Sequence, residues 1–206
     1  MTKNLGLAVA VAIGFAATSV GAQDQEFAKE EFAQQVQALA ENELVTWIED
    51  EVIIDAVREQ NVRNVSMTPE EIEKLDKAWR LQTKKSNKPM IWDLLDRLHS
   101  ILLRDRREGS DGIVTEIIVM DKFGLNAAIS DATSDFYQGD EAKYQETYLI
   151  GPDAVHVGDY EFDESTQKWQ TQVSLTVLDP ETGEPIGAVT FGIDLAALPK
   201  PEPEPS

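Results

Sequence analysis

The chain has no cysteine and only two histidines, His99 and His156, among its 206 residues. Without cysteine it has no disulfide, no thiolate metal site, no thiol nucleophile and no lipidated-cysteine anchor. Any histidine-centred catalytic or metal site would have to use one of the two imidazoles. The sequence therefore excludes disulfide scaffolds, zinc–cysteine modules and cysteine hydrolases.

Basic residues are also scarce. The chain carries 18 Lys and Arg against 38 Asp and Glu, a formal net charge of −20. Nucleic acids and anionic lipid surfaces attract Lys and Arg through their phosphates, so this charge argues against both as partners. A hydrophobic content of 42% is nevertheless sufficient for a packed core.

The negative charge is concentrated in the second part of the chain. Residues 23–110 hold 13 basic and 19 acidic side chains, whereas residues 111–206 hold 4 basic and 19 acidic. A cationic or zwitterionic ligand, or a basic protein partner, is therefore electrostatically favoured in the second part over an anion.

No apolar run reaches the roughly 20 residues that span a bilayer. The stretch Leu5–Val20 follows Lys3 and ends at the small residues Gly21 and Ala22, a pattern typical of a cleaved secretory signal. We expect residues 1–22 to be a signal peptide and the mature protein to be periplasmic. Retention of this segment as a membrane anchor is the alternative.

Residues 23–110 have helical periodicity. One apolar stripe runs from Phe32 to Val57, and a second helix is expected from Thr68, with Thr68 as its N-cap and Pro69 at the first helical position. A third helix is expected over residues 91–107. The stripe of the first helix is wide enough for a homodimer contact through this helix, but packing of the whole stripe on the sheet and the other helices is the favoured interpretation.

Residues 111–198 change to strand periodicity. Strands are expected over residues 113–120, 125–130, 154–162, 168–178 and 185–195, with a short helix over 141–148 that Asp140 caps. The order predicts an α+β fold, in which an antiparallel sheet of about five strands is covered by a long N-terminal helix and additional helices. We expect one domain over residues 23–198 and a disordered Pro/Glu tail over 199–206.

Three segments carry a resemblance to a known family. The hairpin 117–130, with Asp121 and Gly124 at its turn, the loop 133–144, and the closing strands 172–179 and 186–195 together resemble the Cache (PDC-type, PAS-like) extracytoplasmic sensor domains. The resemblance implies a small-molecule ligand bound beside the sheet, no catalysis, and a membrane receptor or kinase partner. We expect a free-standing form of such a domain, because no membrane helix or signalling domain follows Leu195.

The same resemblance places the ligand near the segment after the second strand. Two tyrosines there offer stacking and hydroxyl groups, Asp140 offers an anion for an amine, and Lys143 offers a cation for a carboxylate. Two polar side chains two residues apart on one strand would line the same pocket. The predicted ligand-binding residues are Tyr137, Asp140, Lys143, Tyr144, Gln172 and Ser174.

Two other functions are weighed against a sensor. A ligand-free interaction module with the same fold would use the acidic surface or the first helix, and an unrecognised periplasmic hydrolase would use His99 or His156. No nucleophile elbow, phosphate loop or metal-ligand spacing supports catalysis. The acidic runs 159–164 and 179–184 lack the EF-hand spacing, so no metal and no cofactor is predicted.

Overall fold

The structure, a computed structural model, describes residues 32–163 and 168–199. The predicted signal peptide, residues 1–22, lies outside the described residues, and so does the predicted tail from residue 200 onward. No helix of the described part is long and apolar enough to cross a membrane.

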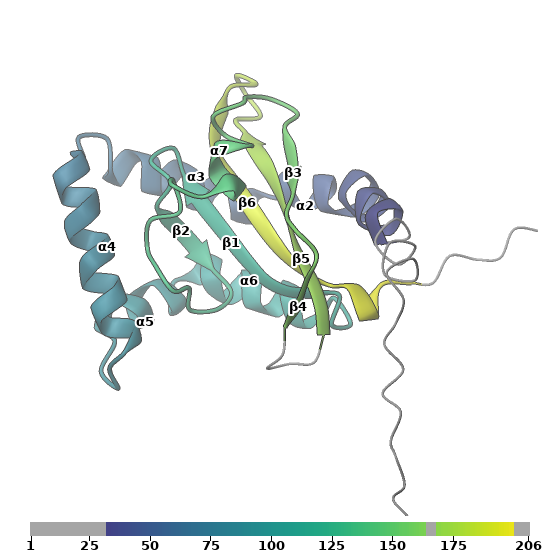
Figure 1. Ribbon diagram of the computed structural model, residues 1–206. Coiled ribbons are helices and arrows are strands. Elements are labelled where there is room, and N and C mark those ends of the chain that lie inside the picture. Colours follow the sequence, from purple (N-terminus) through teal and green to yellow (C-terminus); the bar gives the residue numbers. More distant parts are fainter. Residues whose placement is uncertain (1–31, 164–167, 200–206) are drawn as a thin grey trace, which may run out of the picture.

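An antiparallel sheet forms the centre of the molecule (Figure 1). Its strand order is β2-β1-β6-β5-β3, and β4 pairs with β5 next to β3. All strand pairs are antiparallel, and helices pack against the sheet, so the fold is of the predicted α+β class. The strands are β1 (Val114–Asp121), β2 (Asn126–Ile129), β3 (Val155–Val157), β4 (Glu161–Asp163), β5 (Lys168–Leu178) and β6 (Pro185–Asp194).

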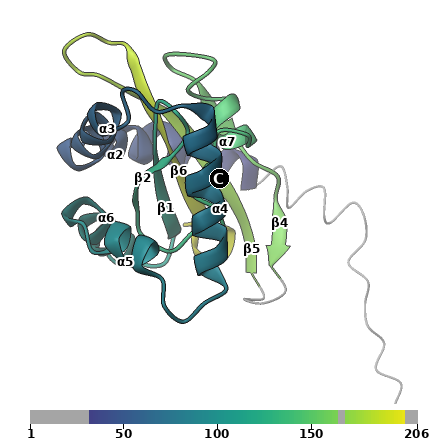
Figure 2. The same ribbon diagram turned by 90° about the vertical axis from the view of Figure 1, so that its left-hand side faces the viewer.

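The helices lie on both sides of this sheet. Figure 2 has α2, α3, α5 and α6 on one side, α7 on the other, and α4 standing across the β2 end. Residues 32–39 are also helical, and a 3-10 turn, η2, follows β6. The helices are η1 (Ala40–Leu44, a π-helical turn), α2 (Val45–Ile48), α3 (Glu51–Arg63), α4 (Pro69–Thr83), α5 (Pro89–Leu95), α6 (Leu98–Glu108), α7 (Ala142–Gln145) and η2 (Leu195–Ala197).

The start of α4 is the one predicted from its residues. The Thr68 hydroxyl accepts a hydrogen bond from the Glu71 N–H, and the Glu71 carboxylate accepts one from the Thr68 N–H. This reciprocal capping box satisfies two N–H groups that the helix itself leaves unpaired. Pro69 at the first helical position has no N–H to satisfy there.

Two predicted helices are interrupted. The N-terminal helix breaks at Asp50, which is extended and accepts a hydrogen bond from the Val52 N–H, so that it caps a new helix, α3. The helix expected over residues 91–107 is two helices, because Arg97 is extended between α5 and α6. Apolar periodicity continues across both breaks, and for this reason it does not reveal them.

The region between β2 and β5 also differs from the prediction. Helix α7 is only one turn, and Glu141 precedes it rather than Asp140, with no side-chain cap. The strand expected over 154–162 is two short strands, β3 and β4. Between them, three residues, 158–160, lie opposite two residues of β5, which is a bulge of one residue.

Two apolar cores fill the space on the two faces. The first packs the N-terminal helices and Leu103 of α6 onto one sheet face, around Phe191 and Val189. The second packs α4, α5 and the segment after β2 onto Ile118 and Met120. On that second face, β5 and β6 carry polar side chains instead, and this polar part of the sheet forms the floor of the site described next.

Candidate functional site: a polar cavity on the sheet

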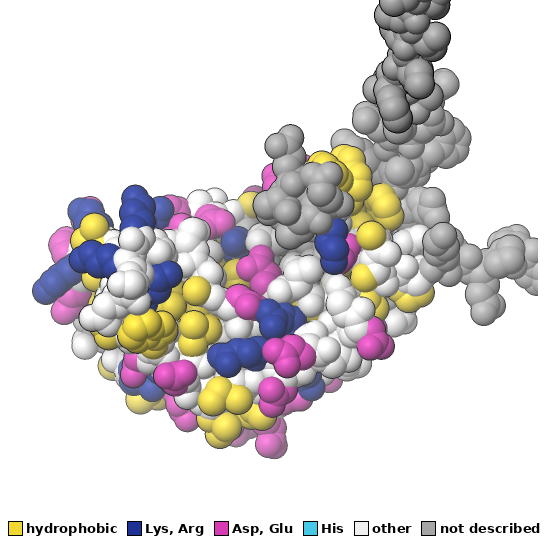
Figure 3. All heavy atoms as spheres, turned by 90° about the horizontal axis from the view of Figure 1, so that it is seen from below, with side chains coloured by type: hydrophobic (Ala, Val, Ile, Leu, Met, Phe, Trp, Pro, Cys, Tyr) yellow, Lys and Arg dark blue, Asp and Glu magenta, His cyan; other side chains and the backbone are white. Residues whose placement is uncertain are grey.

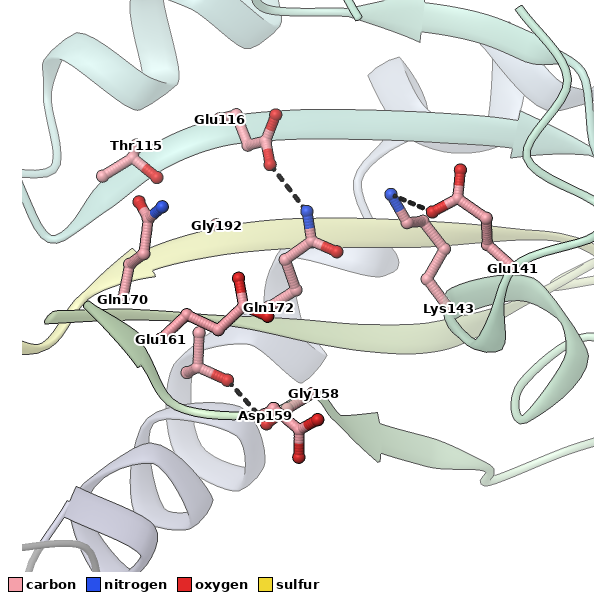
Figure 4. Close-up of a pocket in the computed structure, with 11 residues that line it drawn as sticks. Thr115, Glu116, Glu141, Lys143, Gly158, Asp159, Glu161, Gln170, Gln172 and Gly192 are labelled. Carbon is pink, nitrogen blue, oxygen red and sulfur yellow. Dashed lines mark hydrogen bonds and ion pairs between the residues drawn. The ribbon is translucent and has the colours of Figure 1, made fainter. Parts of the chain in front are cut away.

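Three residues of neighbouring strands form one row across the sheet. Glu116 of β1 pairs with Gly192 of β6, and Gly192 pairs with Gln172 of β5. The Gln172 side-chain amide donates a hydrogen bond of 2.8 Å to the Glu116 carboxylate, over the glycine. In Figure 4 the two side chains point toward each other above Gly192.

Glycine is required at the middle of this row. A Cβ atom on Gly192 would lie 2.7 Å from Glu116 Cγ and 2.5 Å from Thr115 Oγ1. Real Cβ atoms do not approach other atoms so closely, because van der Waals repulsion rises steeply at such distances. The missing side chain thus gives Glu116 and Gln172 the room to meet.

A cavity of about 240 Å³ lies above this row (Figure 4). This volume is below the usual range of drug-sized ligand sites and suits a small metabolite. We call it the sheet cavity. Its walls come from β1, β6, β5, the α7 turn and the β3–β4 bulge, and consist of Thr115, Glu116, Glu141, Lys143, Gly158, Asp159, Glu161, Gln170, Thr171, Gln172 and Gly192.

The bulge that forms one wall is held by the edge of β5. The Gly158 N–H donates to the Gln172 carbonyl at 2.8 Å, and the Thr171 hydroxyl donates to the Gly158 carbonyl at 2.9 Å. These two bonds hold the extra residue of the bulge against β5, so Asp159 and Glu161 lie at the cavity.

Lys143 is the basic side chain of the sheet cavity. Its side chain is only 11% exposed, and its ammonium lies 3.1 Å from a Glu141 carboxylate oxygen. It also donates to the side-chain carbonyl of Gln138 at 3.3 Å. The charge of Lys143 is therefore already compensated within the protein.

Among the side chains that line the sheet cavity, carboxylates outnumber cations. The lining contains four carboxylates, of which those of Asp159 and Glu161 are exposed, and one ammonium group, that of Lys143. The other two carboxylates are those of Glu116 and Glu141. Carboxylates gathered in a recess focus a negative potential there and raise the local concentration of cations. Many basic side chains of the protein lie elsewhere, for example on the face around α5 and α6 that Figure 3 presents.

The structure brings two of the six predicted ligand residues to the sheet cavity, Lys143 and Gln172. Ser174 lies on the same strand face as Gln172 but is fully buried, and its hydroxyl is 2.9 Å from that of Thr190. Asp140 is exposed at the start of the α7 turn and does not line the cavity. A role in binding stays a prediction for all of them.

The two predicted tyrosines pack within the protein. Tyr144 is buried, stacks on Tyr148, and its hydroxyl donates to the Lys122 carbonyl at 2.6 Å. Burial raises the pKa of Tyr144 far above the ordinary value for tyrosine. Tyr137 packs on Gly139, and burial, followed by the nearby Asp140 charge, raises the pKa of Tyr137. Both hydroxyls are therefore neutral over the physiological range.

Sequence reasoning did not single out Glu116 or Gly192, and it weighed the acidic run 159–164 only as a metal site. Glu116 is a single acidic residue in an apolar strand, Thr115 to Met120, and that placement was the available signal. The partner of Glu116 is 56 positions away, and only the pairing of β1, β6 and β5 brings the two together.

A second, more apolar hollow of about 610 Å³ lies between α2, α3 and the ends of β3 and β5. We call it the apolar groove. Its apolar side chains include Ile48, Val155 and Leu178, and its lining also contains the carboxylates of Glu49 and Asp153. The groove shares no lining residue with the sheet cavity.

The two histidines lie on different elements, His99 on α6 and His156 on β3, and both are half-buried. Within residues 32–163 and 168–199, no group of three His, Asp or Glu side chains is placed to hold a metal ion. Neither histidine lines the sheet cavity.

Comparisons with known proteins give structural matches only. No protein-family model and no curated protein matches the chain. The sensor domain of the V. cholerae histidine kinase DctB is 16% identical, with 85% of this chain and 58% of that chain covered and a TM-score of 0.35. The ligand-binding domain of the Pseudomonas aeruginosa amino acid chemoreceptor PctC, in complex with GABA, is 16% identical, with 69% and 56% covered and a TM-score of 0.34.

A third match is the ligand-binding domain of the Campylobacter jejuni chemoreceptor Tlp3 in complex with 4-methylisoleucine, 11% identical, with 72% and 62% covered and a TM-score of 0.36. The chain thus spans about three fifths of the length of these domains. The matched structures are sensor and ligand-binding domains of a histidine kinase and of chemoreceptors. Because the TM-scores are below 0.5, no ligand and no site residue is transferred from them.

Proposed function

We propose that this protein is a periplasmic, non-enzymatic sensor domain that binds a small cationic or zwitterionic metabolite in the sheet cavity. The observation that carries the proposal is the cavity itself, a recess of metabolite size lined by polar side chains of four separate segments and by the Gly192 backbone of β6. Polar groups that are buried or half-buried lose hydration, which costs free energy of folding. Apolar side chains at these positions would avoid this cost, so the polar lining favours a role in binding.

The proposed signal starts at the α7 turn. Lys143 and Glu141 form one wall of the cavity, and the segment that carries them also packs Tyr144 against the second core. If the α7 turn has two conformations, a ligand that binds one of them more tightly increases the population of that conformation. A membrane receptor or kinase that contacts the shifted surface would receive the signal.

A thermal-shift screen against a metabolite library tests the proposal. A ligand at 100 times its Kd adds about 2.7 kcal/mol of stability, which raises Tm by roughly 5–10 °C in a protein of this size. We expect at least one amine-bearing metabolite to do so. A Gln170→Trp variant, which narrows the cavity, should lose the shift, whereas Leu81→Trp on the exposed side of α4 should keep it.

If no metabolite raises Tm, the sensor proposal is wrong. A second function then follows from the apolar groove, which fits an interaction module that binds a basic, amphipathic segment of another protein. Its apolar side chains would bury those of the partner, while Glu49 and Asp153 would attract its cations. A photo-crosslinker at Val155, but not at the exposed Val62, should then trap one partner protein.

The oligomeric state belongs to the same proposal. Most apolar residues of the N-terminal helices, such as Leu44 and Val57, are buried in the first core, and Trp47 packs edge-on against Phe191 at 5.7 Å. A homodimer through these helices would therefore use their exposed side chains. Native mass spectrometry of freshly purified protein measures the oligomeric state and any bound metabolite together.

A further inference from the structure

The charged side chains that line the sheet cavity indicate a narrower class of ligand. Resting on the proposed function, we propose that the cavity selects a linear organic dication, such as a short diamine, over the zwitterion and the dianion of the same length, and that Glu116 receives one ammonium group.

Carboxylates stand on opposite walls of the cavity. Glu116 projects from β1, whereas the exposed Glu161 belongs to β4, on the far side of β6 and β5, and the neighbouring Asp159 points away from Glu116 (Figure 4). Three strand spacings separate these walls, about 14 Å between backbones. The uncharged amides of Gln170 and Gln172 lie between them (Figure 4). A chain with a cation at each end matches this arrangement of charge.

Glu116 is prepared to accept a cation. Gln172 holds one of its carboxylate oxygens at 2.8 Å, which fixes the side chain over Gly192. A carboxylate accepts several hydrogen bonds through its two oxygens, so capacity for an ammonium remains after this bond. Charge-assisted bonds of this kind are the stronger ones.

A carboxylate on the ligand has no comparable partner in the cavity. Lys143 is the basic residue that lines it, and Lys143 is paired with Glu141 and Gln138. A ligand carboxylate at Lys143 would share the ammonium group with Glu141 and would lie beside that carboxylate and the other carboxylates of the cavity. Like charges at such short distances repel one another, so an amino acid should bind more weakly than a diamine.

Three molecules of one length test this selection. The probes are 1,4-diaminobutane, 4-aminobutanoate and butanedioate, which carry charges of +2, 0 and −2, and the measurement is titration calorimetry on the purified protein at low ionic strength. We expect the diamine to bind at least tenfold more tightly than 4-aminobutanoate, and butanedioate not to bind. The affinity for the diamine should fall with added salt.

Glu116→Gln is the decisive variant. A glutamine at this position still accepts the Gln172 hydrogen bond through its side-chain carbonyl, so the row is kept and only the charge is removed. We expect at least a tenfold loss of diamine affinity with Tm unchanged. The matched control is Glu146→Gln, an exposed glutamate just after α7 that does not line the cavity, and it should bind the diamine as wild type does.

Two results would overturn the inference. One is binding of 4-aminobutanoate or butanedioate as tight as that of the diamine, and the other is an unchanged diamine affinity in Glu116→Gln. If none of the three probes binds while another metabolite raises Tm, the dication inference fails and the sensor proposal stands. If no metabolite binds at all, both fail.

Discussion

The side-chain amide of Gln172 on β5 reaches the carboxylate of Glu116 on β1 at 2.8 Å, across the strand that lies between them. The contact exists because the intervening residue, Gly192, has no side chain. This row forms the floor of the sheet cavity. The pairing of β1, β6 and β5 therefore positions the side chains that we propose bind the ligand.

Replacing Gly192 with alanine should disrupt the Glu116–Gln172 contact while the fold is kept. The new Cβ would lie 2.5 and 2.7 Å from side-chain atoms of Thr115 and Glu116, and these atoms can move. We expect a loss of about 1–3 kcal/mol in the free energy of unfolding, together with loss of ligand binding. Urea unfolding and calorimetry measure the two effects.

Gly187→Ala is the matched control on the same strand. Its Cβ would lie 2.2 Å from the Met120 carbonyl oxygen, a backbone atom that cannot move without shifting β1. The loss of stability should exceed that of Gly192→Ala. Equal or smaller destabilisation by Gly187→Ala would contradict the packing described for these two strands.

Tyr144→Phe separates a packing role from a ligand role. The Tyr144 hydroxyl donates to the Lys122 carbonyl, so its removal should cost about 1 kcal/mol of stability. Because Tyr144 does not line the sheet cavity, the affinity for any cavity ligand should stay within twofold of wild type. A large loss of ligand affinity at unchanged stability would show that Tyr144 takes part in binding and would contradict this prediction.

Asp50 should stabilise the start of α3 in a pH-dependent way. A hydrogen bond from the Val52 N–H and the nearby Arg106 guanidinium hold the pKa of Asp50 below its ordinary value. Asp50→Ala should therefore cost about 1 kcal/mol at neutral pH. A lowered carboxyl pKa gives its full stabilisation above the pKa of the unfolded state and loses it as the pH falls through the pKa of the folded state. The cost of Asp50→Ala should therefore shrink as the pH falls below about 4.

Asp50→Asn provides the control, because its side-chain carbonyl still accepts from Val52 while the charge is gone. Most of the stability should be kept at neutral pH, and the remaining difference from wild type should vanish in acid. Thermal unfolding from pH 3 to 7 measures both variants. A cost of Asp50→Ala that grows in acid would contradict the assignment.

Asp121 should behave in the opposite way. Its carboxylate accepts from the Phe123 and Leu125 N–H groups and from the Asn64 amide, but burial outweighs these bonds and raises the pKa of Asp121. A raised carboxyl pKa favours the fold most at low pH, and this contribution declines as the pH rises through the folded-state pKa. The stability difference between wild type and Asp121→Asn should therefore narrow from pH 4 to pH 8.

Asp121→Asn should also lose about 1–3 kcal/mol, because its amide faces the Asn64 amide and two donors meet. Exchanging the two residues, Asn64→Asp with Asp121→Asn, restores a donor opposite an acceptor and should recover part of the loss. An exchange variant no more stable than the single variant would show that the loss has another origin.

Local sequence signals predicted much of the fold. The Thr68 N-cap, the turn at Gly124 and the two hairpins are each specified by residues close together in the chain, and the structure has them. The breaks at Asp50 and Arg97 were missed because the apolar period runs on through them. The bulge at Gly158 was missed because it depends on a register with β5.

The site was less predictable than the fold. Lys143 and Gln172 were found because the resemblance pointed to the segment after β2 and to the closing strands, and both line the sheet cavity. Glu116 and Gly192 were not found, because their roles arise only when β6 is placed between β1 and β5. Residue type alone did not separate the cavity from the buried core positions of Tyr144 and Ser174.

The most direct test of the central claim is an amide NMR titration of the isotopically labelled protein with 1,4-diaminobutane. Binding in the sheet cavity should shift the Gln172 side-chain amide and the backbone amides of Gly158 and Gly192 first and most strongly. Signals of Ile48 and Leu178, at the apolar groove, should stay in place. Shifts confined to the groove, or no saturable shift at the cavity residues, would contradict the account.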